Sequence, residues 1–517
     1  MDTPPVSDPV AQYQQALALH QAGRLDEAAA AYRAMLERNA RDHLSLTGLG
    51  KVEAAAGNAA DAVRLFTQSL AVMPDQPETL TNLGAALIRL GHPDEALAHL
   101  DRAIAIKPDL VAAHNNRGTA LLALLQPAAA LESFDHAVAL RPELGVIHAN
   151  RGIVLQALGQ PDAALAAYDQ AIALQPDYVE AYTNRGNVLR ELRRPAEALA
   201  SYDRALALNP SAAETYNNRG NVLGDLGHRE QAIQSFDRAI ALKPDNAEAW
   251  GNRGVALKDM NRLEDALHSL DRAIALQPDD ADAYTNRGVV LSGLRRLDAA
   301  LANHDRALAL APDSADAYNN RGNVLRDLGR AEEAIQSYGR AIALRPDEAE
   351  AWSNRGLALS ELGRHEDAIM DYDQALALDA AYPQARWNKG LLELLLGNYA
   401  TGWPLYESRW ADSQKHLARN FSQPVWLGSQ SIAGKTVLIH AEQGYGDFIM
   451  CCRYIPMVEA LGASVVVEAF PPLLPLAATL KGNYTLVASG QPLPHFDLHC
   501  PVMSLPLAFK TTLETIP

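Results

Sequence analysis

Cysteine is scarce in this chain. There are three among 517 residues, and all of them (Cys451, Cys452 and Cys500) lie near the C-terminal end. Their spacing matches no metal-ligand pattern. Adjacent residues on a helix point to different faces, so a structural disulfide between Cys451 and Cys452 is not expected. We therefore expect no bound metal and a reducing, cytoplasmic location.

Long apolar runs are also missing. The segment Met1–Pro9 contains acids and prolines and no apolar stretch, which excludes a signal peptide. No stretch approaches the roughly 18 uninterrupted apolar residues of a membrane span. We expect residues 1–8 to be a disordered N-terminus and the chain to have no membrane span.

Positive charge is in deficit. Lys and Arg number 45 against 62 Asp and Glu, for a formal net charge of -17. Binding to phosphate backbones needs a basic stripe, so nucleic acid is not an expected partner. Aromatic residues make up only 6% of a chain rich in alanine and leucine, a composition that suits helices packed on helices.

What the sequence does contain is a period of 34 residues. The same interval separates successive glycines from Gly50 to Gly390 and successive asparagines from Asn82 to Asn388. A fixed period of this length indicates a stacked array in which no unit can bury its apolar face alone. The prolines of the period are Pro74, Pro108, Pro142, Pro176, Pro210, Pro244, Pro278, Pro312 and Pro346.

One unit, residues 213–246, carries two amphipathic stretches separated by Gly227. Its residues resemble the tetratricopeptide pattern of two helices and two turns. Gly220 is expected to let the helices approach closely, and Phe236 to fill the gap between them. The pattern elements in this unit are Tyr216, Arg219, Gly220, Leu223, Ala232, Phe236, Ala239 and Pro244.

The resemblance to tetratricopeptide repeat proteins sets the expected domains. We expect a mostly α chain: a right-handed α-solenoid of about eleven to twelve helix-turn-helix repeats, followed by a partial α/β Rossmann-like domain. The expected boundaries are 9–382 for eleven repeats, 383–421 for a degenerate repeat and junction, and 422–517 for the α/β part.

An asparagine precedes the packing glycine by two residues in each regular unit. In tetratricopeptide arrays the first helices line the concave groove, so these amides are expected to form one polar row. Such a row suits the backbone of an extended protein or peptide ligand, although tightening of helix contacts explains asparagine here equally well. The predicted groove residues are Asn116, Asn150, Asn184, Asn218, Asn252, Asn286, Asn320 and Asn354.

A charged pair recurs as well. Arginine directly precedes the packing glycine from Arg117 to Arg355, and an aspartate recurs on the second helix, as at Asp101 and Asp237. An arginine inside a helix interface needs a partner, because an unpaired buried charge is costly. We expect each aspartate to pair with the arginine of the next unit, with Asp373 meeting Lys389 and with Gly339 leaving Arg355 unmatched.

Beyond Lys435 the pattern changes to strands alternating with helices. Strands are predicted at 436–440, 464–468, 484–488 and within 496–500, with helices at 448–461 and 471–480, which favours a parallel sheet. The glycine loop between the first strand and the first helix could approach an anion closely.

These residues also resemble a known junction and catalytic region. Residues 397–410, 440–447, 452–456 and 496–506 are similar to bacterial fusions of tetratricopeptide repeats with heptosyltransferase-like, GT-B-fold (family 9) glycosyltransferases. The overall plan resembles O-linked N-acetylglucosamine transferases.

The resemblance implies a candidate site. Asp447 would be the general base for an acceptor hydroxyl, with capping of the helix that follows as the alternative. The acceptor- or anion-binding loop would consist of Glu442, Gln443, Gly444, Gly446 and His499. His440 is a further candidate, with a core role as the alternative.

A GT-B enzyme needs two Rossmann-like halves, and the second holds the nucleotide-sugar. Only the first is expected here, so no cofactor is predicted unless a second half is supplied, and enzymatic activity stays open. The predicted function is a protein-interaction scaffold joined to an incomplete glycosyltransferase domain. The alternatives are a non-enzymatic adaptor with a remnant α/β domain and a chaperone-like assembly scaffold. The sequence does not define the oligomeric state.

Overall fold

A computed structural model describes residues 9–411, 419–442 and 444–517. The predicted N-terminal segment 1–8, and Gln443 of the predicted loop, lie outside the described residues. By contacts the chain divides into two compact units, Met1–Arg262 and Leu263–Pro517, and each is described by itself.

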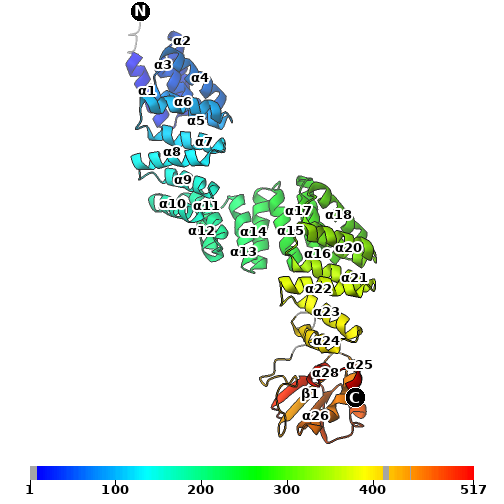
Figure 1. Ribbon diagram of the computed structural model, residues 1–517. Coiled ribbons are helices and arrows are strands. Elements are labelled where there is room, and N and C mark those ends of the chain that lie inside the picture. The colour runs from blue at the N-terminus through cyan, green and yellow to red at the C-terminus, as the bar shows by residue number, and fades with distance from the viewer. Residues whose placement is uncertain (1–8, 412–418, 443) are drawn as a thin grey trace, which may run out of the picture. The chain divides into compact units, whose positions relative to one another are not determined.

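The first unit consists of helices that alternate between 13 and 14 residues in length and pack as consecutive antiparallel pairs (Figure 1). The helices are α1 (Pro9–Gln21), α2 (Leu25–Arg38), α3 (His43–Ala55), α4 (Ala59–Val72), α5 (Pro77–Arg89), α6 (Pro93–Ile106), α7 (Val111–Ala123), α8 (Pro127–Leu140), α9 (Gly145–Ala157), α10 (Pro161–Leu174), α11 (Val179–Glu191), α12 (Pro195–Leu208), α13 (Ala213–Asp225), α14 (Arg229–Leu242) and α15 (Ala247–Asp259).

The second unit continues the same helix pattern and ends in a small sheet. Its repeat helices are α16 (Leu263–Leu276), α17 (Ala281–Gly293), α18 (Leu297–Leu310), α19 (Ala315–Asp327), α20 (Ala331–Leu344), α21 (Ala349–Glu361), α22 (His365–Leu378), α23 (Pro383–Leu395) and α24 (Tyr399–Tyr406), followed by the 3-10 helix η1 (Glu407–Trp410). The predicted fold class, a long series of helix-turn-helix repeats before a partial α/β part, is confirmed.

Steric fit between a glycine and a large ring joins the two helices of a pair. A Cβ on Gly220 would lie 2.5 Å from the buried Phe236 ring, and one on Gly322 would lie 2.5 Å from Tyr338. Only glycine leaves room for these rings, which explains the 34-residue glycine period.

The predicted charged pairs form between successive repeats. Asp237 accepts a hydrogen bond from Arg253 at 2.6 Å, and Asp305 accepts one from Arg321 at 2.7 Å. The arginine side chain is mostly covered, whereas about half of the aspartate side chain is exposed. The remaining predicted pairs are Arg117–Asp101, Arg151–Asp135, Arg185–Asp169, Arg219–Asp203, Arg287–Asp271 and Lys389–Asp373.

Several of these arginines reach a third helix through serine. Arg219 also donates to Ser235 Oγ at 2.7 Å, and Arg321 to Ser337 Oγ at 2.6 Å. One guanidinium therefore ties the second helix of the preceding repeat to both helices of its own repeat.

The C-terminal sheet has four parallel strands in the order β3-β2-β1-β4. The strands are β1 (Thr436–His440), β2 (Ser464–Ala469), β3 (Tyr484–Ala488) and β4 (Leu498–Pro501), close to the predicted positions. The short helices between and after them are α25 (Tyr445–Cys451), η3 (Cys452–Tyr454), α26 (Ile455–Ala460), η4 (Pro471–Leu473), α27 (Leu474–Ala477), η5 (Val502–Ser504), α28 (Leu505–Ala508) and η6 (Leu513–Thr515).

The prediction of one continuous helix over 448–461 is wrong. The segment is broken into α25, η3 and α26, because Pro456 cannot donate an amide hydrogen and its ring clashes with the preceding turn. The prediction of a helix over 471–480 is wrong in the same way: it consists of η4 and the short α27. Proline fragments both connections.

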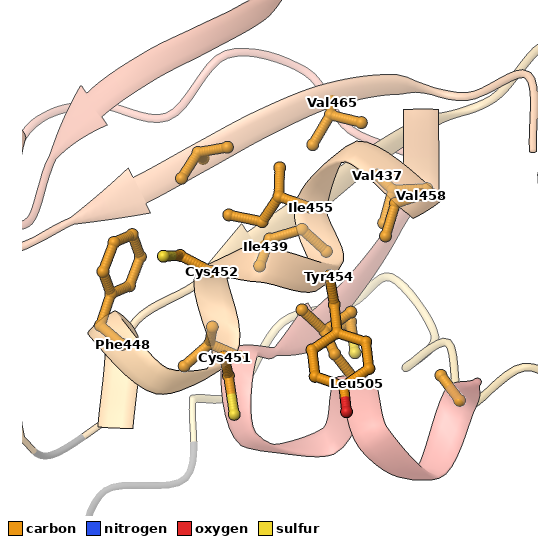
Figure 2. Packing of buried hydrophobic residues seen from close by; sticks show 14 of the residues in the cluster. Val437, Ile439, Phe448, Cys451, Cys452, Tyr454, Ile455, Val458, Val465 and Leu505 are labelled. Atoms are coloured by element: carbon orange, nitrogen blue, oxygen red, sulfur yellow. The ribbon is translucent and has the colours of Figure 1, made fainter. Parts of the chain in front are cut away.

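The two faces of the sheet are covered differently. Figure 2 shows Ile455 and Val458 of α26 beside Val437 and Ile439 of β1 and Val465 of β2, within one buried cluster. The other face carries a smaller cluster around Leu438, Val466 and Phe496. Side chains alternate along a strand, so neighbouring residues of β1 and β4 belong to opposite faces.

All three cysteines are free thiols buried in this part of the chain. Burial raises the pKa of Cys451 to about 12. Among the described helices, none is both long enough and apolar enough to cross a lipid bilayer.

Candidate functional site

The first unit contains a groove along its first helices. A hollow of about 420 Å³ lies between α11, α13 and α15. Most of its lining residues lie on these first helices, while Arg229 and Phe236 come from α14. Those on the first helices include Arg190, Asn221, Asp225, Glu248, Asn252 and Asp259.

The predicted asparagine row is half-buried and partly linked from repeat to repeat. Asn252 Nδ2 donates to Asn217 Oδ1 at 3.1 Å, and Asn354 donates to Asn319 at 3.0 Å. The same bond joins Asn150 to Asn115 at 2.9 Å. These amides connect successive first helices, as the structural interpretation of the row requires.

In both units a glutamate accepts a hydrogen bond from the asparagine that precedes the row. Asn217 Nδ2 donates to Glu248 Oε1 at 2.9 Å, and Asn319 donates to Glu350 at 3.0 Å. Asn217 is itself buried and accepts from Asn252. The bond to Asn217 uses one N–H of Asn252, which leaves the second N–H and the carbonyl oxygen of this amide for a ligand.

A second amide row stands beside the first. Asn187 Oδ1 accepts from Asn218 Nδ2 at 3.0 Å and from the Tyr202 hydroxyl at 2.6 Å. Asn323 likewise accepts from Tyr338 at 2.8 Å. Sequence reasoning missed this row, although asparagine three residues after the first row could have revealed it.

The other members of the row differ. Asn116 accepts from Asn115 at 3.4 Å, and Asn286 donates to the Asp282 carbonyl at 3.0 Å. Asn184 and Asn320 have no hydrogen-bond partner among the side chains and backbone groups that the structure describes. The row therefore combines amides held by neighbours with amides that can turn toward a ligand.

A buried ion cluster lies where the repeats meet the sheet. Arg409 of η1 is fully buried and donates to Glu442 at 3.0 Å and to Glu407 at 2.7 Å. It also donates to Ser504 Oγ at 2.7 Å, while Glu442 Oε1 accepts from the Met503 amide at 2.8 Å. Glu442 follows β1 and Ser504 follows β4, so Arg409 bridges the carboxyl ends of two adjacent strands.

Both carboxylate oxygens of Glu442 accept hydrogen bonds within this cluster. Burial raises the pKa of the Glu442 carboxyl, and the Arg409 guanidinium opposes that rise. Burial alone would lower the pKa of Arg409, but Glu407 and Glu442 hold it above its usual value. The carboxylate is turned into the protein rather than presented to an acceptor.

Asp447 is the third residue of α25 and is partly exposed. The N-cap position belongs to Gly444, and a Cβ there would lie 3.2 Å from Asp447 Oδ2. Gly446 follows in the first turn with open space around its Cα. The carboxylate thus stands in the first turn of α25, beside the glycine loop.

His499 is not brought to that loop. It lies on the opposite face of the sheet, where His440 Nε2 and His499 Nδ1 are 3.2 Å apart and Phe421 packs on both rings. Burial, followed by His499 and Arg419, lowers the pKa of His440 to about 3. His440 is therefore neutral at physiological pH and packs as core, and burial lowers the pKa of the half-buried His499 as well.

Among the described residues, no group of His, Cys, Asp and Glu could hold a metal ion. The hydrogen-bonding groups that the structure does gather are side-chain amides along a groove. Two-helix units stacked in series with such a groove define a helical-repeat binding protein.

Comparison with known families gives the same answer. Tetratricopeptide repeat models match residues 9–34, 53–125, 149–213, 213–246, 247–280, 269–302, 305–336, 322–363 and 349–382. The chain belongs to the tetratricopeptide repeat family, and its array is a protein-interaction scaffold.

Similar proteins share only parts of the chain. Protein FlbA of Caulobacter vibrioides is 39% identical over 70 residues, which span 13% of this chain and 12% of that protein. YrrB, described as a tetratricopeptide protein with an unusual peptide-binding site, is 29% identical over 36% of this chain and 96% of its own, with a TM-score of 0.32. Yeast Tom70 is 16% identical over 78% of this chain and 99% of its own, with a TM-score of 0.38.

Proposed function

We propose that the groove of the repeat array holds an extended polypeptide segment by its main chain. The observation that carries this proposal is the array of side-chain amides on neighbouring first helices, with two on α11, three on α13 and Asn252 on α15. Each amide offers both a donor and an acceptor, as does each peptide group of an extended ligand. Contacts of this kind read the backbone, so the groove accepts many sequences.

The neighbours of the row support binding as well as stability. Asn217 and Asn187 fix the orientation of Asn252 and Asn218 by accepting one N–H from each. An amide oriented before binding loses less side-chain freedom when a ligand arrives. The remaining N–H and carbonyl of each amide then meet the ligand without rearrangement.

The test is selection of random 12-residue peptides displayed on phage against the full chain. Selected peptides are then measured on the variant Asn218→Ala/Asn252→Ala. We expect at least about tenfold weaker binding, in line with the loss of two ligand hydrogen bonds. The matched control is Gln126→Ala/Gln160→Ala, which removes two exposed side-chain amides before α8 and α10, outside the asparagine row. If selected peptides bind the double variant as well as the unaltered chain, the groove is not their site.

A second proposal concerns the α/β part. We propose that it is the first half of a GT-B-type glycosyltransferase in which Asp447 assists attack of an acceptor hydroxyl on a nucleotide-sugar. The parallel sheet, the glycine loop after β1 and the accessible carboxylate at the start of α25 support this assignment. Because the donor would be held by a second Rossmann-like half, from the same or another chain, the assay is run on the gene product as isolated from its cells.

In that assay, release of the nucleoside diphosphate is followed with a panel of nucleotide-sugars. Asp447→Asn should lower acceptor-dependent release about 100-fold or more, the effect typical of a lost general base. Glu459→Gln, on the neighbouring helix, serves as the control. If no nucleotide-sugar binds the isolated gene product, the transferase proposal is wrong, and the scaffold function is unaffected.

A further inference from the structure

The groove of the first unit changes in chemistry along the array. On α9 the groove positions hold Val146 and Ile153, which are 44% and 39% exposed. On α11, α13 and α15 the first of these positions is a glutamate, and the second is asparagine on α11 and α13 and Val255 on α15. The hollow between α13 and α15 lies in this second stretch and contains the carboxylates of Asp225, Glu248 and Asp259.

Three of the acids stand where a helix disfavours them. Glu191, Asp225 and Asp259 are the last residues of α11, α13 and α15, and all three are exposed. The C-terminal end of a helix carries partial negative charge, so cations are stabilising there and carboxylates are destabilising. The earlier helices α5, α7 and α9 end instead in Arg89, Ala123 and Ala157.

The protein compensates these charges only weakly. Arg190 Nε lies 3.9 Å from Asp225 Oδ2, and Lys258 Nζ lies 3.6 Å from Asp259 Oδ1, beyond good hydrogen-bond distance in both cases. Arg229 also lines the hollow. Glu191 has no ion-pair partner among the described side chains.

A second set of acids lies at the other end of these helices. Glu180, Glu214 and Glu248 are the second residues of α11, α13 and α15. Glu248 lines the hollow together with Asp225 and Asp259, so carboxylates from both ends of α15 and from the end of α13 meet in one hollow. Between them lie the amides of Asn221 and Asn252.

We infer that this stretch of the groove binds a partner segment that carries lysine or arginine side chains. The inference rests on the proposed groove function and adds the chemistry of the partner. The amides bind the extended main chain, while cationic side chains reach the carboxylates at the helix ends. There they meet both the acidic groups and the partial negative charge of the helix C-termini.

The structural cost of these acids supplies a test with two independent readouts. The variant Glu191→Gln/Asp225→Asn/Asp259→Asn keeps side-chain shape and removes three negative charges. If the acids serve the fold, the variant melts at a lower temperature. If they serve a cationic ligand, the melting temperature stays the same or rises, because the unfavourable interaction with the helix ends is gone, while binding weakens.

The probes are three labelled 15-residue peptides of the repeat Ser-Ala-X, with X as lysine, glutamine or glutamate. We expect the lysine peptide to bind the full chain at least about tenfold more tightly than the glutamine peptide, and the preference to shrink as salt screens it. The triple variant should lose that preference. The matched control Glu132→Gln/Asp162→Asn/Glu230→Gln removes three exposed acids outside the groove and should retain it.

The outcomes distinguish the preference for a cationic partner from main-chain binding in the groove. Equal binding of lysine and glutamine peptides, or equal loss of lysine binding in the control variant, overturns the cationic partner and leaves main-chain binding in place. The cationic partner is also ruled out if the triple variant melts at a lower temperature and still binds the lysine peptide as tightly as the unaltered chain. Absence of binding by every peptide, including those selected on phage, rejects the groove function itself.

Discussion

Arg355 donates two hydrogen bonds to Asp371 of its own repeat, one from Nε and one from Nη2, and each is 2.7 Å long. In other repeats the arginine partner is an exposed aspartate of the preceding repeat, but that position is Gly339 here. The acid has moved to the position where Ser235 and Ser337 stand elsewhere. Asp371 has only 6% of its side chain exposed, so this pair is far more buried than the others.

Replacing Asp371 by serine should therefore be costly. The change leaves a guanidinium in the helix interface without a carboxylate, and breaking a buried pair costs about 3 kcal/mol or more. The exposed pair offers the comparison: Asp237→Ala removes a half-exposed carboxylate and should cost about 1 kcal/mol or less. Hydrogen exchange resolved by repeat would measure both, since repeats unfold in part independently.

The carboxylate that pairs with Arg355 can be moved from position 371 to position 339, where other repeats carry an aspartate. A Cβ on Gly339 would meet only Arg355 Nη1, at 3.9 Å, so an aspartate fits there. Gly339→Asp/Asp371→Ser should recover most of the stability that Asp371→Ser loses. If the double variant is no more stable than the single one, Asp371 acts by something other than its pairing with Arg355.

Much of the array could be predicted because its contacts are local and repeated. The fit of Gly220 against Phe236, and the pairing of Asp237 with Arg253, join residues 16 positions apart, and the period repeats them. Asp371 was missed because it occurs once. Its role depends on the absence of an acid at position 339, which a pattern search reads only as a mismatch.

The candidate α/β site was harder to predict. The strands followed from apolar runs, but the contact of Arg409 with Glu442 and Ser504 depends on how the last repeat packs on the sheet. No periodicity encodes it. The placement of His499 away from Asp447 follows from strand alternation, which sequence reasoning could have applied once β4 was located.

The turns between paired helices give a stabilising prediction. The residue two positions after each first helix adopts a left-handed conformation, usually as glycine, but Leu125 and Arg295 occupy it with φ of 58° and 59°. A side chain there costs about 1 kcal/mol, and Leu125 is also 88% exposed. Leu125→Gly should raise the melting temperature, whereas the reciprocal change Gly227→Leu should lower it. Equal melting curves for both would contradict the conformational argument.

His304 makes the second half of the array sensitive to acid. It packs against Gly288 where Tyr338 and Tyr372 stand in later repeats, and neither ring nitrogen has a hydrogen-bond partner among the described residues. Burial lowers its pKa from 6.5 to about 4, with Asp305 opposing and Arg321 adding to the shift. The unfolded chain therefore binds a proton at a higher pH than the folded chain does.

For a depressed folded-state pKa, the stability is present above pH 6.5 and is lost as the pH falls toward 4. A shift of this size corresponds to about 3 kcal/mol. His304→Tyr should reduce the difference in stability between pH 7 and pH 4 relative to the unaltered chain. The comparison of the two proteins removes the contribution of the many carboxylates that titrate in both. An identical pH dependence would mean that the pKa of His304 is the same in the folded and unfolded chains, and that burial does not depress it.

The buried cluster at the junction predicts that the α/β part depends on the end of the repeats. Arg409→Met removes the cation from between Glu407 and Glu442 and leaves two carboxylates in a buried site, which should cost about 3 kcal/mol or more. Removing charge on both sides, in Arg409→Met/Glu442→Gln, should be less harmful than the single change, because only Glu407 stays unpaired. Thermal unfolding would show the order of stability. If the single variant is as stable as the unaltered chain, the guanidinium is not needed to hold the ends of β1 and β4 against η1.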